Sequence, residues 1–180
     1  MTFKSHHDAA HLYFVTAAVC GWKRLFDTPT YADIVLNSLD WLRRNGRMSL
    51  FAFVLMPSHL HAIVKPRDRS IADLLQDFGS FTAHEIIRLL KRDGRADLLD
   101  FFRAQRRDAR HQHSIWQDIQ AKNVHSPEFL REKLDYIHNN PLAKEWQLAE
   151  TRSDYRYSSA CFYDEGVKPI VEVDDVREWL

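Results

Sequence analysis

The stretch VLMPSHLHAIVKP (54–66) places two histidines one residue apart within an apolar segment. Apolar, strand-forming runs lie on both sides of its Pro-Ser pair, at 48–56 and 59–65, and predict two strands joined as a hairpin. Side chains at positions i and i+2 of a strand point to the same face of a sheet. His59 and His61 would therefore converge, and two imidazoles make half of a divalent metal site. The spacing alone favours a plainer interpretation, a strand with two partly exposed histidines.

The elements around this hairpin predict the fold class. Hydrophobic periodicity and capping signals give the order β-α-β-β-α-β-α. The predicted elements are a strand at 12–20, helices at 28–46 and 70–94 flanking the hairpin, a helical or irregular insertion at 97–112, a short strand at 113–119 and a helix at 126–140. This order is typical of an α+β, ferredoxin-like or RRM-like sandwich, an antiparallel sheet with helices packed on one face.

Composition sets limits on the class of protein. The chain has 180 residues, which suits one domain, and we assign 1–165 to it and 166–180 to an acidic C-terminal extension. Lys plus Arg and Asp plus Glu both number 25, so any nucleic-acid binding must depend on a local basic patch. The two cysteines form no CxxC pair, and no apolar run approaches the roughly 20 residues of a membrane helix. We therefore expect a cytoplasmic protein without a membrane partner.

A second group of residues with a possible chemical function lies in DYIHNNP, near the end of the last clearly predicted helix. Tyr136 and Asn140 are four residues apart and share one helix face. A tyrosine hydroxyl can act as a nucleophile on a phosphodiester, and an asparagine oxygen is a hard metal ligand. Seen alone, Tyr136 would be a core contact and Asn140 a helix C-cap. Three tyrosines further along compete for the nucleophile's role, Tyr155, Tyr157 and Tyr163, but none has an asparagine four residues later on a helix.

Together, MPSHLHAIV, GSFTAHEI, IWQ, YIHNNP and DYRYSS resemble the single-tyrosine HUH transposases. The branch they are most similar to is the REP-associated tyrosine transposases, relatives of small insertion-sequence transposases. The likeness runs from about Tyr13 to Tyr163, and the HUH element (His, hydrophobic, His) is His59-Leu60-His61. The resemblance implies an HUH endonuclease fold, with the pair of histidines on a sheet strand and the tyrosine on a helix.

The resemblance also implies a reaction and a set of site residues. Tyr136, His59 and His61 would be catalytic, and Mg²⁺ or Mn²⁺ would be held by His59, His61 and Asn140. Tyr136 would attack single-stranded DNA, giving a 5′-phosphotyrosine link and a free 3′-hydroxyl. The expected substrate is single-stranded, hairpin-forming repeat DNA. Since some relatives act as dimers and others as monomers, a homodimer is also considered.

A run of basic residues is the expected contact with DNA phosphates. The run continues from the end of the 70–94 helix into the next segment, and its members are Arg88, Lys91, Arg92, Arg103, Arg106, Arg107 and Arg110. A solvated helix face is the equally weighted alternative. Trp116, Phe101 and Phe102 could stack on unpaired bases, although burial in the core is the commoner role for such aromatics.

The leading hypothesis is a metal-dependent single-stranded DNA endonuclease and strand transferase. One alternative is a non-catalytic nucleic-acid-binding module on the same scaffold. Another is a structural protein that retains a vestigial site. Covalent attachment of DNA to the protein distinguishes the first hypothesis from the other two.

Overall fold

The computed structural model describes residues 11–106 and 113–180. The strands are β1 (Leu12–Val19), β2 (Met48–Met56), β3 (His59–Pro66) and β4 (Trp116–Val124). The α-helices are α1 (Pro29–Arg44), α2 (Ile71–Arg92), α3 (Ala96–Ala104), α4 (Pro127–Asn139) and α5 (Ala160–Glu165). Short 3-10 turns lie at Cys20–Trp22, Leu25–Asp27, Asn140–Leu142 and Arg177–Trp179. None of these described helices is long and apolar enough to cross a membrane.

The four strands form one antiparallel sheet in the order β2-β3-β1-β4. The hairpin predicted around the paired histidines is present, and β2 and β3 pair from Met56 opposite His59 back to Met48 opposite Pro66. On its other side β3 pairs with β1, which places Thr16 directly opposite His61. This order is that of a β-α-β-β-α-β ferredoxin-like sheet, so the predicted α+β class is confirmed.

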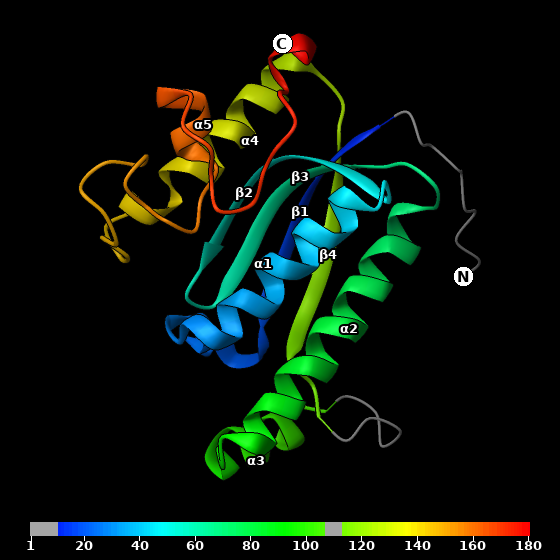
Figure 1. Ribbon diagram of the computed structural model, residues 1–180, viewed down its shortest axis with the longest axis vertical. Coiled ribbons are helices and arrows are strands. Elements are labelled where there is room, and N and C mark those ends of the chain that lie inside the picture. The colour runs from blue at the N-terminus through cyan, green and yellow to red at the C-terminus, as the bar shows by residue number, and fades with distance from the viewer. Residues whose placement is uncertain (1–10, 107–112) are drawn as a thin grey trace.

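The helices cover both faces of the sheet, where the sequence predicted one (Figure 1). Alternate residues of β1 separate the two cores: Val15 and Ala17 pack with α1 and α2, whereas Phe14 packs with α4. The side chains of His59 and His61 point to the α4 face, because they alternate with Leu60, which lies in the core under α1 and α2. A helix that brings a catalytic group to these histidines must therefore lie opposite α1 and α2.

The start of helix α4 and the face that it buries follow from local features that can be read in the sequence. The Ser126 side chain accepts a hydrogen bond from the amide of Phe129, and a proline occupies the first turn. Leu130 and Ile137 are buried against the sheet. They lie seven residues apart on the inner face of the helix, so Tyr136 is carried at the edge of this contact.

Two segments differ in extent from their predictions. Strand β4 runs from Trp116 to Val124, further than the predicted 113–119, because a polar edge strand has little apolar pattern and is defined by its backbone pairing with β1. The insertion predicted at 97–112 is helical over Ala96–Ala104, and its positions 107–112 lie outside the described residues.

The last fifteen residues pack onto the domain. Val171 and Val173 join the core under α1 and α2, and Val176 joins the core under α4. The amide of Asp174 donates to the carbonyl of Leu50 at 2.7 Å, next to strand β2. The acidic C-terminal extension therefore lies along one edge of the sheet and contributes to both hydrophobic cores.

Candidate active site

The paired histidines form a compact, buried group at the start of β3. His59 and His61 are 4% and 5% exposed, and their ring centroids lie 4.8 Å apart in an edge-on arrangement. The HxH spacing therefore produces convergence, as strand geometry predicts, and the two rings are buried where the plainer interpretation had them partly exposed.

Each imidazole is oriented by a neighbouring hydroxyl. The Thr16 hydroxyl lies 2.9 Å from Nδ1 of His61, and the Ser58 hydroxyl lies 3.2 Å from Nδ1 of His59. Metal-binding histidines are commonly held in this way, with one ring nitrogen bonded to a supporting group and the other bound to the ion. The arrangement leaves Nε2 of each ring as its metal-binding atom.

Burial keeps both rings neutral. Desolvation lowers the pKa of His59 to about 4, against an opposing contribution from the side chain of Asn140. Desolvation, together with the charges of His59 and Lys133, lowers the pKa of His61 to about 3. At neutral pH both imidazoles are therefore in the form that binds metal ions.

Tyr136 reaches the same point from α4. Its hydroxyl lies 3.4 Å from Nε2 of His61, and the two rings are 5.1 Å apart. Phe14 is shared by both groups: it stacks on His61 and meets Tyr136 edge-on. With 48% of its surface exposed, Tyr136 borders the imidazoles and remains open to a large substrate.

Asn140 completes the group one helical turn after Tyr136. The residue is only 9% exposed and lines the same cleft as His59 and Tyr136. Within the described part of the chain, Oδ1 of Asn140 is buried without a hydrogen-bond partner. A buried unpaired oxygen is costly, so a ligand bound there would remove a penalty.

The donor set fits a divalent cation. Nowhere in residues 11–106 and 113–180 do three or more His, Cys, Asp or Glu side chains group as a metal site, so a third protein ligand must be of another type. The unpaired oxygen of Asn140 is a donor that could take this place beside the two neutral imidazoles. Three protein ligands leave coordination positions open, which is typical of catalytic sites. Oxygen ligands suit Mg²⁺ and Mn²⁺, and imidazole nitrogens favour Mn²⁺ of the two.

The group opens into a cleft of about 540 Å³. Its lining residues are Trp22, His59, Glu132, Asp135, Tyr136, Asn139, Asn140, Ala143, Glu145 and Trp146. The cleft thus lies between the 3-10 turn after β1, the start of β3, one side of the C-terminal half of α4 and the segment that follows α4.

The competing tyrosines have structural contacts. The hydroxyl of Tyr155 donates to the carbonyl of Leu55 at 2.9 Å, and that of Tyr163 donates to the carbonyl of Phe51 at 2.7 Å. Burial raises the pKa of both phenols well above the usual range. The DYRYSS motif therefore fastens the chain to strand β2. His138, two residues after Tyr136, is 1% exposed, and its Nε2 lies 3.0 Å from the Ser159 hydroxyl.

The predicted DNA-contact residues that the structure describes lie on α2, on α3 and just after the end of α3. Three of them form ion pairs with neighbouring carboxylates, Arg88 with Glu85, Arg92 with Asp93 and Arg103 with Asp100. Lys91 and Arg106 are exposed beside them, and Arg107 and Arg110 lie outside the described residues. Exposed ion pairs are weak, so these guanidinium groups can exchange partners with phosphates.

Two of the aromatics considered for base stacking are turned inward. Phe102 is fully buried, and the indole N–H of Trp116 donates to the hydroxyl of Thr82 at 2.9 Å. Phe101 lies against Gly21, where a β-carbon would come within 2.8 Å of its ring. Helix α3 thereby packs against the turn that leads from β1 to the cleft, and its basic residues lie on the same end of the molecule.

Comparison with known proteins identifies the fold. No protein-family model and no curated protein sequence matches the chain. The structure of a REP-associated tyrosine transposase bound to a REP hairpin matches with a TM-score of 0.63 and 17% identity, covering 98% of this chain and 93% of that one. A proposed transposase from Deinococcus radiodurans R1 gives a TM-score of 0.44 and 14% identity, over 77% of this chain and 97% of that one.

The first likeness shows that the chain has the fold of a REP-associated tyrosine transposase over nearly its whole length. The resemblance that the sequence motifs carry is confirmed at the level of the fold. At 17% identity, the likeness says nothing of the chemistry, which must be argued from the site itself.

Proposed function

We propose that this protein is a metal-dependent endonuclease and strand transferase of the HUH single-tyrosine type, acting on single-stranded DNA. The observation that carries the proposal is the 3.4 Å approach of the Tyr136 hydroxyl to Nε2 of His61, from elements 75 residues apart in the chain. The unpaired oxygen of Asn140 at the same point supports a ligand set of His59, His61 and Asn140.

In this proposal Tyr136 is the nucleophile. Its oxygen attacks the phosphorus of a DNA phosphodiester, forming a bond to the 5′-phosphate while the bond to the 3′-oxygen breaks. The phenol proton passes to the water that reaches this half-exposed side chain, and the leaving 3′-oxygen takes a proton from water. Attack by the same 3′-hydroxyl, or by that of another end, reverses the step and joins strands without another energy source.

The surrounding residues prepare this attack. A bound divalent cation would neutralise charge on the scissile phosphate and polarise its phosphorus. Thr16 and Ser58 fix the orientation of the imidazoles, and Phe14 fixes the Tyr136 ring against His61. Holding the nucleophile and the phosphate in one geometry lowers the entropic part of the barrier.

Single-stranded DNA with a hairpin is the substrate class that we infer. The structural neighbour is bound to a REP hairpin, and this chain has that fold. Its exposed basic residues lie on α2 and α3, and Phe101 of α3 packs against Gly21, the neighbour of Trp22 in the cleft. Phosphate contacts of this kind give an affinity that falls as salt concentration rises.

The test uses 5′- and 3′-labelled hairpin oligonucleotides with random single-stranded flanks, incubated with Mn²⁺ and resolved on denaturing gels. We expect a protein-linked fragment that carries the DNA 3′ of the nick, and its loss in Tyr136→Phe. Tyr157→Phe is the matched control and keeps the adduct. DNA binding without an adduct in the native protein would instead indicate a non-catalytic nucleic-acid-binding module.

A further inference from the structure

Two indoles line the cleft: Trp22 is exposed, and Trp146 is partly buried against the core under α4. The ring of Trp22 lies 5.3 Å from that of His59, and the ring of Trp146 lies 5.7 Å from the same imidazole. Both line the cleft that contains Tyr136. Trp22 is 55% exposed, which is unusual for the largest apolar side chain, and the ring contacts the candidate metal ligand instead of the core.

The backbone is strained where these indoles are presented. Trp22 has φ of 52°, directly after Gly21 at φ of 60°, and Gln147, next to Trp146, has φ of 47°. In the described parts of the chain, Trp22 and Gln147 are the two non-glycine residues with positive φ. Such conformations are unfavourable for bulky residues and concentrate at functional sites. Both strained positions belong to the turns that hold the two indoles.

The charges around the cleft indicate which part of a nucleotide these indoles take. Glu132, Asp135 and Glu145 line the same cleft, so an anionic phosphate is disfavoured in the part of it that lies away from the imidazoles and the cation proposed there. A flat, uncharged nucleobase is not repelled by these carboxylates, and every base has a face that can stack on an aromatic ring. The guanidinium of Arg24, which pairs with Asp27, lies over the Trp146 ring at 5.5 Å from its centre.

We infer that Trp22 and Trp146 hold the unpaired nucleobase next to the scissile phosphate, by stacking. This inference rests on the proposed function and names the part of its substrate that fixes the cleavage position. With the base on the indoles beside His59, the adjoining phosphodiester lies over the imidazoles and Tyr136. Trp22 and Trp146 are thus positioning residues for the strand.

The first test measures binding without cleavage, in a Tyr136→Phe background with Mn²⁺. The probes are fluorescein-labelled hairpin oligonucleotides with dA or dT single-stranded flanks, titrated by anisotropy. We expect Trp22→Ala and Trp146→Ala each to weaken binding by about 5-fold to 100-fold. Trp22→Phe, which keeps an aromatic face, recovers most of this loss.

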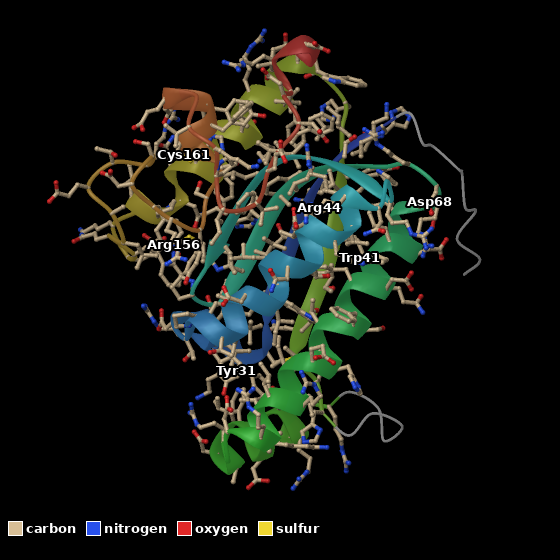
Figure 2. All side chains as sticks on the ribbon, in the orientation of Figure 1. Tyr31, Trp41, Arg44, Asp68, Arg156 and Cys161 are labelled. Carbon is tan, nitrogen blue, oxygen red and sulfur yellow. The ribbon has the colours of Figure 1, made fainter. Side chains whose placement is uncertain are left out.

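Trp41→Ala is the matched control. Trp41 is exposed to the same 55%, but projects from α1 into a groove beside α2, on the other face of the sheet (Figure 2). Its removal should leave binding unchanged. Thermal unfolding by circular dichroism checks that all variants fold. Binding that is weakened no more by Trp22→Ala and Trp146→Ala than by Trp41→Ala overturns the inference.

A second arm replaces single flank nucleotides with abasic ones. One abasic position should lower the affinity of the parent protein to that of a Trp22→Ala/Trp146→Ala double variant, and lower that of the double variant no further. Equal losses in both proteins contradict stacking. Adduct formation by the native protein is scored separately. If adducts form but DNA binding does not depend on Trp22 and Trp146, this inference alone is refuted. If DNA binding depends on the two indoles but no adduct forms, the nuclease proposal is refuted and the base contact stands.

Discussion

Replacing Thr16 with valine tests how far the Thr16 hydroxyl supports the imidazole of His61. The Thr16 hydroxyl lies 2.9 Å from Nδ1 of His61 and comes from β1, the neighbouring strand. Valine has nearly the same shape and suits a strand, so the substitution removes the hydrogen bond with little change in packing. His61 then keeps its place but loses the group that fixes its tautomer and ring orientation.

The expected effects differ in size for stability and for metal binding. Losing one partly buried hydrogen bond costs about 0.5–1.5 kcal/mol of unfolding free energy. Losing a supporting group of a metal-bound histidine costs about 10-fold to 100-fold in metal affinity. Thr16→Val should therefore fold normally and require about 10-fold to 100-fold more Mn²⁺ for half-maximal adduct formation.

The assay combines Mn²⁺ titrations of adduct formation with calorimetric Mn²⁺ binding and urea unfolding. Ser49→Ala is the control, because the Ser49 hydroxyl is also a strand hydroxyl and accepts a hydrogen bond from Arg67, far along β2 from the cleft. It should lose comparable stability and no metal affinity. A Thr16→Val protein with the Mn²⁺ affinity of the native protein would refute the supporting role.

Three further outcomes follow from other contacts. Burial lowers the pKa of His138 to about 4, so the unfolded chain takes up a proton first as the pH falls. His138 thereby accounts for about 2 kcal/mol of the stability lost between about pH 7 and pH 5, in addition to the losses from His59 and His61; urea unfolding of His138→Gln should show a fall that is smaller by this amount. A β-carbon at Gly79 would lie 2.7 Å from the Ile119 side chain, so Gly79→Ala should stabilise the protein only when it is combined with Ile119→Val. The gain in helix propensity is then up to about 1 kcal/mol of unfolding free energy, seen as a higher melting temperature. Arg92→Gln and Arg106→Gln should each reduce the salt dependence of single-stranded DNA binding by about 0.7 in log–log slope, with similar loss for all sequences; unchanged slopes would exclude phosphate contacts.

Local patterns predicted the elements well where periodicity was strong. The apolar run around His59 and His61 predicted a strand, and the capping residue Ser126 predicted the start of α4. The i to i+4 relation of Tyr136 and Asn140 also follows from helix geometry. That these two elements meet was implied by the family resemblance, because spacing within one segment cannot show contact between segments 75 residues apart.

Other features had no readable signal. Placing α4 opposite α1 and α2 depends on which sheet face His59 and His61 occupy, and a strand buried on both faces hides that choice. Trp22 and Trp146 lie in turns outside any periodic pattern. The exposure of Trp22 and the positive φ of Trp22 and Gln147 appear only in three dimensions. Trp116 and Phe102, which the sequence offered for stacking with core burial as their commoner role, are engaged in packing.

The most direct test of the central claim locates the covalent bond. Trypsin releases LDYIHNNPLAK (134–144), which contains Tyr136 as its single tyrosine and Asn140 in the same peptide. After reaction with hairpin DNA and Mn²⁺ and digestion by nuclease and trypsin, tandem mass spectrometry should find a nucleotide 5′-phosphate on Tyr136 of this peptide. A nucleotide on another tyrosine, or an unmodified peptide in protein that has cleaved the DNA, would contradict the assignment.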